Sequence, residues 1–184
     1  MRDTNSRYGN LPPRPPVLLF QIVQKFYRGA VSHYPVIELA KEQLRQAVFE
    51  WEACIETKNN DELEAEELVR KALTTLFLEF HFYVTCWLQI DLALHRLCIQ
   101  PNGSVFCRLK QRFSDDIERH LAVRHCVDDT EACVIAQMEH TEGDLSQLAN
   151  DSYWFDGRLF TVDTTSLHTL NELYRAIMEK RGSV

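Results

Sequence analysis

The sequence predicts an all-α fold, a helical bundle of about five to six helices with one long central helix and a small β-hairpin. Three observations support this prediction. Most of the 184 residues lie in stretches where apolar side chains recur at helical spacing. Residues 72–98 are apolar on almost every side, which is typical of a helix enclosed by others. Strand-like runs are apparent only near 153–162, on either side of an Asp-Gly pair.

Prolines mark the boundaries of the first predicted elements. Residues 1–16 contain PPRPP and are expected to form a disordered or polyproline-like arm, with 17–184 as one domain. A first helix is predicted over about 17–31, and Pro35 precedes a second helix that runs to about Lys58. Its apolar positions recur at helical spacing: Ile37, Leu44, Ala47, Val48, Trp51, Cys54 and Ile55.

The predicted central helix has clear start and stop signals. Asn59-Asn60-Asp61, with Glu64 three residues after the aspartate, is typical of a capping box, and Pro101-Asn102-Gly103 is a stop signal. A pattern of about 40 residues would be roughly 60 Å long, so a kink or break is expected. Its aromatic residues are interpreted as core rather than as a base-stacking surface.

The C-terminal part is predicted to hold the smaller elements. A helix is expected over 104–125, followed by a helical or irregular stretch over about 131–149. Asp156-Gly157 between YWF and RLFTV predicts a tight hairpin. A final helix begins near 163–166 and ends at Gly182.

Composition excludes several classes of protein. No run of about 18 apolar residues could cross a bilayer, and the N-terminus lacks the apolar core of a secretion signal, so a cytoplasmic protein without membrane contact is expected. The six cysteines are scattered and are predicted to be free thiols. No metal or cofactor is predicted, because close CxxC or HxxxH pairs, Gly-rich phosphate loops and Ser-based catalytic motifs are absent from the sequence.

The charge is unevenly distributed along the chain. A net charge of −7 argues against a whole-molecule field that attracts nucleic acid, so such a contact requires a local patch. Residues 108–125 carry five Lys or Arg against three acids, whereas 126–163 carry nine acids and the single base Arg158. The first stretch is therefore the favoured place for an anionic ligand, although a mixed-charge segment is equally typical of a solvated helix face.

The motif RHLAVRH, residues 119–125, lies at the end of this basic stretch. It resembles the Arg-x(4 to 6)-His signature of the HEPN superfamily, in which a polar residue commonly follows the Arg, as His120 does here. The resemblance implies a metal-independent endoribonuclease, a homodimer of toxin–antitoxin or defence type with an antitoxin or regulatory partner. Arg119 would hold the scissile phosphate of RNA, and His125 would act as general acid/base on the ribose 2′-hydroxyl.

The residue types suit this chemistry, but an ideal helix separates them. A guanidinium presents a donor fork to phosphate oxygens, and an imidazole titrates near neutral pH, so neither requires a metal. Six residues along a straight helix leave the side chains roughly 120° apart around the axis and about 9 Å apart along it. Convergence therefore requires that the helix end or distort between Leu121 and His125, or that a second protomer complete the cleft.

Three further residues are candidates around this pair. His120 and Arg124, at i and i+4, share a helix face and form either the functional pair or its support. Asp91 and His95 have the same spacing in the most apolar helix. Asp91 is either a satisfied core carboxylate or a group that orients Arg119 or His125. The alternative function is a non-catalytic helical interaction module whose acidic segment 126–163 docks a basic partner.

Overall fold

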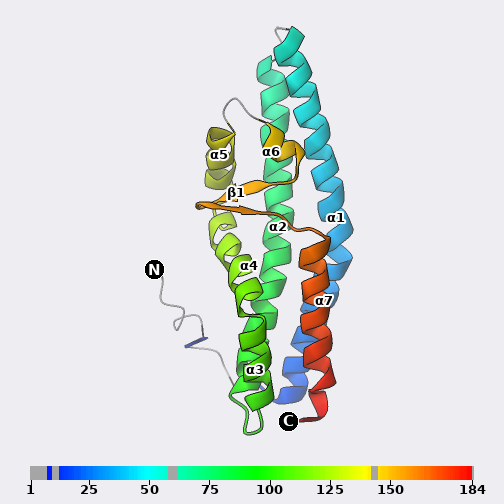
Figure 1. Ribbon diagram of the computed structural model, residues 1–184, viewed down its shortest axis with the longest axis vertical. Coiled ribbons are helices and arrows are strands. Elements are labelled where there is room, and N and C mark those ends of the chain that lie inside the picture. The colour runs from blue at the N-terminus through cyan, green and yellow to red at the C-terminus, as the bar shows by residue number, and fades with distance from the viewer. Residues whose placement is uncertain (1–7, 10–12, 58–61, 142–144, 184) are drawn as a thin grey trace. The chain divides into compact units, whose positions relative to one another are not determined.

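The computed structural model describes residues 8–9, 13–57, 62–141 and 145–183, and within them it is an all-α helical bundle with one hairpin (Figure 1). The predicted fold class is confirmed, with seven α-helices in the described residues. The elements are α1 (Pro16–Thr57), α2 (Glu62–Cys98), α3 (Ser104–Arg112), α4 (Ser114–Val127), α5 (Thr130–His140), α6 (Ser146–Ala149), β1 (Tyr153–Phe155), β2 (Arg158–Phe160), α7 (Thr164–Glu179) and a 3₁₀ turn, η2 (Arg181–Ser183).

The chain divides into two compact units, each built from non-consecutive segments. Unit 1 comprises residues 1–31, 85–121 and 164–184, and unit 2 comprises 32–84 and 122–163. Helices α1, α2 and α4 each continue from one unit into the other. The sequence of unit 1 carries thirteen Lys and Arg against seven Asp and Glu, a net charge of +6, whereas that of unit 2 carries seven against twenty, a net charge of −13.

The first two predicted helices are one helix. Helix α1 is 42 residues long and passes through Pro35, so the expected break there is wrong. Proline lacks an N–H and its ring crowds the preceding turn, which normally ends a helix. Pro35 is exposed, however, and Ala30 and Ile37 on either side of it are fully buried. Burial of the same helix face before and after the proline offsets the loss of one hydrogen bond.

Helix α2 is unbroken over its 37 residues, so the break allowed for its length does not occur. The predicted start signal at 59–61 lies outside the described residues. Most apolar residues of 72–98 are fully buried, as expected for a central helix. The helix is not enclosed all round, because Leu78 is 53% exposed and Phe82 is 45% exposed.

The turn after α2 depends on a close approach of backbones at Gly103. A Cβ atom at this position would collide with the carbonyl oxygens of Leu97 and Cys98. The predicted helix over 104–125 is two helices, α3 and α4, separated by the single buried residue Phe113. The Phe113 N–H still bonds to the Leu109 carbonyl, so the interruption is local.

The hairpin in unit 2 forms where it was predicted. Strand β1 pairs antiparallel with β2, and Tyr153 faces Phe160. The turn residues Asp156 (φ 44°) and Gly157 (φ 84°) both have the positive φ that a two-residue hairpin turn requires. Before it, the stretch left as helical or irregular forms α5 and α6. The hairpin packs on α2 through an aromatic cluster: Phe77, Phe80, Tyr153, Phe155 and Phe160.

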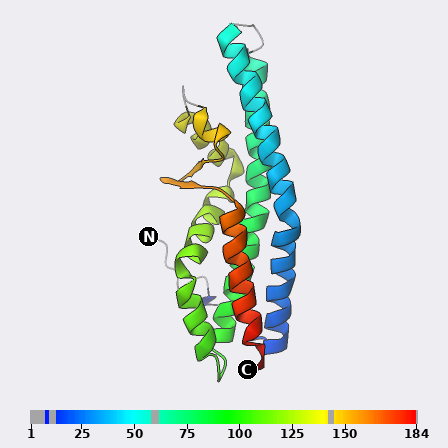
Figure 2. The same ribbon diagram turned by 45° about the vertical axis from the view of Figure 1, so that its right-hand side comes forward.

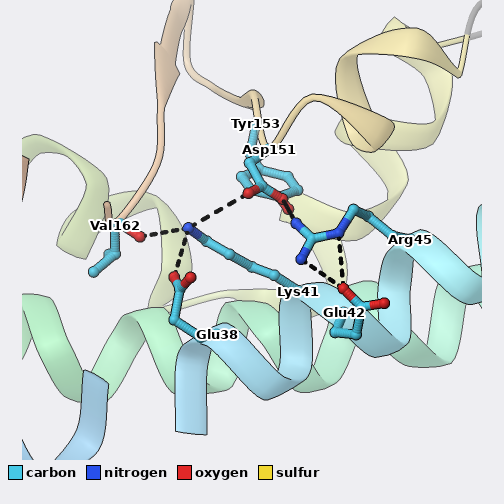
Figure 3. A network of polar contacts seen from close by, with 7 residues as sticks. All are labelled: Glu38, Lys41, Glu42, Arg45, Asp151, Tyr153 and Val162. Carbon is cyan, nitrogen blue, oxygen red and sulfur yellow. Dashed lines mark hydrogen bonds and ion pairs between the residues drawn. The ribbon is translucent and has the colours of Figure 1, made fainter. Parts of the chain in front are cut away.

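A buried lysine attaches the hairpin segment of unit 2 to α1 (Figure 3). The Lys41 side chain is only 2% exposed. Its ammonium donates to the Val162 carbonyl at 2.6 Å and to Glu38 at 3.1 Å, and Asp151 lies 3.8 Å away. Asp151 also accepts from Arg45 at 2.8 Å. The three carboxylate and carbonyl groups satisfy a charge that would otherwise be costly to bury.

In unit 1, α7 lies beside the first part of α1, as both views show (Figures 1 and 2). The rings of Tyr27 and Tyr174 stack 3.7 Å apart, and the Tyr27 hydroxyl donates to Asn171. Within the predicted N-terminal arm, 1–7 and 10–12 lie outside the described residues. Tyr8 is described and is held: its ring stacks on His95 at 3.9 Å, so the arm is not disordered at this position.

Two further predictions concern composition. All six cysteines are free thiols, as expected. In the part of the chain that the structure describes, no helix is both long enough and apolar enough to cross a membrane.

Candidate functional site

The Arg-His motif lies on helix α4, and the charged residues at both ends of this helix favour helix formation. Asp115 and Asp116 lie in its first turn, and Arg124 and His125 lie in its last turn. This arrangement of charge complements the helix dipole at both ends. Ile117 and Leu121 anchor the helix because both are almost fully buried. The side chains of the motif are therefore presented by a fixed backbone.

Arg119 is on the solvent side of α4. Its side chain is 49% exposed, and its nearest carboxylate is Asp116, at 4.0 Å one turn earlier. An exposed pair at this distance contributes little to stability. The guanidinium is therefore available to an anionic ligand.

His120, the polar residue that follows Arg119, is fully buried in unit 1. Its Nδ1 lies 2.6 Å from the Asp116 carbonyl oxygen, and its Nε2 lies 2.7 Å from the Ser166 hydroxyl. A carbonyl oxygen only accepts, so Nδ1 donates to it, while Nε2 pairs with the Ser166 hydroxyl. The imidazole also stacks on Trp87 at 4.1 Å. These contacts fasten the start of α7 to α4 and α2, which indicates a structural role for His120.

Arg124 is committed to a carboxylate in unit 2. Its guanidinium donates to Asp128 at 3.1 Å, the residue that follows the end of α4. Asp128 also lies 3.3 Å from the His81 ring. The predicted functional pair of His120 and Arg124 is thus split between separate partners. The Arg124–Asp128 pair joins the last turn of α4 to the residue that follows it.

His125 is exposed, and its side chain makes no hydrogen bond or ion pair with any residue in the described ranges. Helix α4 is continuous from Ser114 to Val127, so it does not end between Leu121 and His125, which was one of the two conditions for convergence of the pair. Along this one helix the Arg119 and His125 side chains are therefore roughly 120° apart. Of the two routes by which they could meet, the second protomer is the one that remains.

Asp91 is a paired core carboxylate, although its partners differ from those predicted. It has no exposed surface and accepts from Lys110 at 2.7 Å and from the Tyr8 hydroxyl at 2.7 Å. Burial lowers the pKa of Lys110, but the charge and hydrogen bond of Asp91 outweigh this and raise the pKa overall. His95, the partner suggested by i, i+4 spacing, instead stacks on Tyr8.

A large acidic cavity lies in unit 2. Its volume is about 980 Å³, and α1, α2 and α5 line it. Five of its lining residues are glutamates: Glu52, Glu56, Glu62, Glu66 and Glu139. Trp51, Ile55 and Met138 supply apolar surface beside them. Only Glu139 belongs to the acidic segment 126–163, so most of this charge comes from the two long helices.

Sequence reasoning missed the residues whose partners are distant in the chain. Tyr8 contacts a carboxylate 83 positions away, and Lys41 contacts a carbonyl 121 positions away. For Lys41 a signal existed, since it falls between the buried positions Ile37 and Leu44 of one helix face. No local pattern marks Tyr8. Among the described residues, no group of three or more His, Cys, Asp or Glu is placed to hold a metal ion.

Compared with known protein families, curated proteins and solved structures, the chain matches none. The likeness to the HEPN superfamily therefore depends on the motif at 119–125 and on its chemistry.

Proposed function

We propose that the protein is a metal-independent endoribonuclease that acts through Arg119 and His125. The observation that carries this proposal is the exposure pattern of α4. The two residues to which the motif assigns chemistry are both open to solvent, whereas His120 between them is buried and hydrogen-bonded. Arg119 and His125 are therefore both accessible to an RNA substrate, as this chemistry requires.

RNA carries its own nucleophile, so two side chains suffice for the reaction. His125 takes the proton from the ribose 2′-hydroxyl, and the 2′-oxygen attacks the adjacent phosphorus. The bond from phosphorus to the 5′-oxygen breaks, which leaves a 2′,3′-cyclic phosphate. The 5′-oxygen takes a proton from water, and His125 later returns its own proton to solvent. Arg119 holds the phosphate oxygens as negative charge develops on them.

A second copy of the chain completes the site in this proposal. Because α4 is regular, one helix presents Arg119 and His125 in different directions. A two-fold axis beside α4 would bring Arg119 of one protomer near His125 of its partner. The proposed enzyme is therefore a homodimer, and its activity per chain falls on dilution.

Cleavage of a labelled RNA in the presence of EDTA tests the proposal. Arg119→Ala and His125→Ala should each reduce the rate by at least about 100-fold, the typical contribution of a general acid/base. Arg175→Ala, at an exposed arginine of α7, is the matched control and should retain full activity. Cleavage that persists in both α4 variants would exclude this function.

The acidic cavity favours a second candidate, a module that binds a basic segment of another protein. Five glutamates face a groove with apolar walls, and among the described residues that line it Arg70 is the single base. The Arg70 guanidinium is already paired with Glu66 at 2.8 Å, so most of the negative charge is available to a partner. A cationic amphipathic helix would meet both the charge and the apolar walls.

Binding of a Lys- and Leu-rich helical peptide distinguishes this candidate. Glu52→Gln combined with Glu56→Gln should weaken the complex and its salt dependence. Glu172→Gln, an exposed glutamate of α7 outside the cavity, provides the control. Equal affinity of the peptide for the unaltered protein, the double variant and the control would eliminate the cavity as the docking site.

A further inference from the structure

A small cleft in unit 1 has an apolar floor. Its volume is about 300 Å³, and α1 and α2 form its walls. Leu19, Ile22 and Phe26 line it from α1, and Leu92 and Ala93 line it from α2. Leu19, Ile22 and Phe26 recur at a spacing of about one helical turn and occupy one face of α1. Leu92 and Ala93 are adjacent on α2, between the lining residues Gln89 and Arg96.

Cations surround this floor. Arg14 lies in the segment before α1, Lys25 lies on α1, and Arg96 lies on α2. Among the described residues that line the cleft, none is Asp or Glu, and Gln89 is the remaining polar one. No ion pair joins any of the three cations to a carboxylate within the described ranges. Lys110, by contrast, is a unit 1 cation that is paired, with Asp91.

Arg96 provides a donor that points to a ligand. Its Nε atom is buried, and it donates no hydrogen bond to any described residue. Buried polar atoms of proteins almost always have a partner. An acceptor oxygen on a molecule bound in the cleft would provide that partner.

The charge of unit 1 favours an anion at this place. Its net charge is +6, although the whole chain carries −7. A cleft with low-dielectric walls concentrates such a field and raises the local concentration of anions. The cations of the cleft therefore act within a generally positive unit.

We propose that this cleft binds a nucleotide, with its phosphate on Arg14, Lys25 and Arg96 and its base on the apolar floor beside Phe26. Guanidinium groups match phosphate oxygens in a bidentate manner, and three cations suit a phosphate better than a singly charged carboxylate. A nucleobase of any kind can stack on an aromatic side chain, because every base has a flat π-face. A volume of 300 Å³ is at the lower end for small-molecule sites, which fits one nucleotide and excludes a docked helix.

The nucleotide has two possible sources, a free mononucleotide or one residue of a single strand. The inference goes beyond the proposed function because it requires no cleavage. Thymidine monophosphate and a ten-residue oligothymidylate are the probes, measured by calorimetry and by fluorescence anisotropy with the full chain. Neither probe has a 2′-hydroxyl, so a failure of the ribonuclease proposal leaves this test intact.

Lys25→Gln and Arg96→Gln should each weaken binding of the probe by about tenfold, the effect of losing one charge-assisted hydrogen bond. Each should also reduce the slope of log affinity against log salt for the oligonucleotide by about one. Arg175→Gln removes an exposed cation of unit 1 outside the cleft and should leave the affinity within about twofold. Circular dichroism checks the fold, and Lys25→Gln at an exposed position carries the test if Arg96→Gln unfolds.

Each result has a defined meaning. Binding of the monophosphate indicates a free-nucleotide site, and binding of the oligonucleotide alone indicates a strand site. Equal weakening by all three variants would show a diffuse field and overturn the proposal. Absence of binding by both probes, or equal competition by octanoate, would overturn it as well.

Discussion

Adjacent residues of α4 have opposite environments, and burial determines what each can do. Arg119 extends into solvent with a weak contact to Asp116, whereas His120 has no exposed surface and uses both ring nitrogens within the protein. A general base must reach its substrate, so an enclosed and doubly bonded imidazole does not suit that role. Its contacts to Trp87 and Ser166 instead join three helices of unit 1.

Replacement of His120 by Ala should therefore act on stability. Loss of the buried ring and of its two hydrogen bonds should lower the free energy of unfolding by about 3 kcal/mol. Arg119→Ala, at the exposed position directly before His120, should change the free energy of unfolding by less than about 0.5 kcal/mol. Urea unfolding followed by circular dichroism measures both. Unchanged stability together with lost cleavage in His120→Ala would instead assign His120 to catalysis, as its position in the motif suggests.

Asp91→Asn separates two roles for the buried carboxylate. In the structure Asp91 neutralises Lys110 and accepts from Tyr8, so removal of its charge leaves a partly buried ammonium without its counter-ion. The free energy of unfolding should fall by about 3 kcal/mol. Thermal or urea unfolding measures this change, with the conservative exposed variant Asp115→Asn as control. A stable Asp91→Asn protein with impaired cleavage would support the role of orienting Arg119 or His125.

At the scale of elements, the local rules predicted most helices and the hairpin, and failed where distant packing outweighed them. Asp156-Gly157 determines its turn through backbone conformation alone, so the sequence sufficed. Pro35 does not end α1, because buried residues continue on both sides of it. Phe113 interrupts the predicted helix at a buried position that no local signal distinguishes. For the site, the residues of α4 were predicted, and the separate partners of His120 and Arg124 were not.

The junction between α2 and α3 gives a prediction that belongs to this scale. Gly103→Ala places a Cβ against the backbone oxygens of Leu97 and Cys98, which cannot move without distorting the end of α2. The variant should lose about 2 to 3 kcal/mol of stability. Gly182→Ala is the matched control, because no described atom lies within 4 Å of the added methyl group. Chemical denaturation of the two proteins compares them, and similar stabilities would contradict the close approach.

At the scale of the whole molecule, a modest net charge conceals two strongly charged halves. The charge of −7 is the sum of +6 in unit 1 and −13 in unit 2, and both units are assembled from segments distant in sequence. Net charge alone argued against nucleic acid, but a polyanion responds to the local field. Arg119 and the cationic cleft belong to unit 1, whereas the acidic cavity belongs to unit 2.

This division predicts where a nucleic acid contacts the chain. Ultraviolet crosslinking of an oligouridylate to the protein, followed by mass spectrometry, should place most adducts in residues 1–31, 85–121 and 164–184, with His125 as the exception that the proposed function requires in unit 2. Phosphates are attracted to the positive unit and repelled by the negative one, and this preference should weaken as salt shortens the screening length to about 3 Å at 1 M. A Lys-rich peptide labelled with a photoreactive group is the control of opposite charge and should mark 32–84 and 122–163. Oligouridylate adducts concentrated in unit 2 would show that close contacts, rather than the charge of each unit, direct binding.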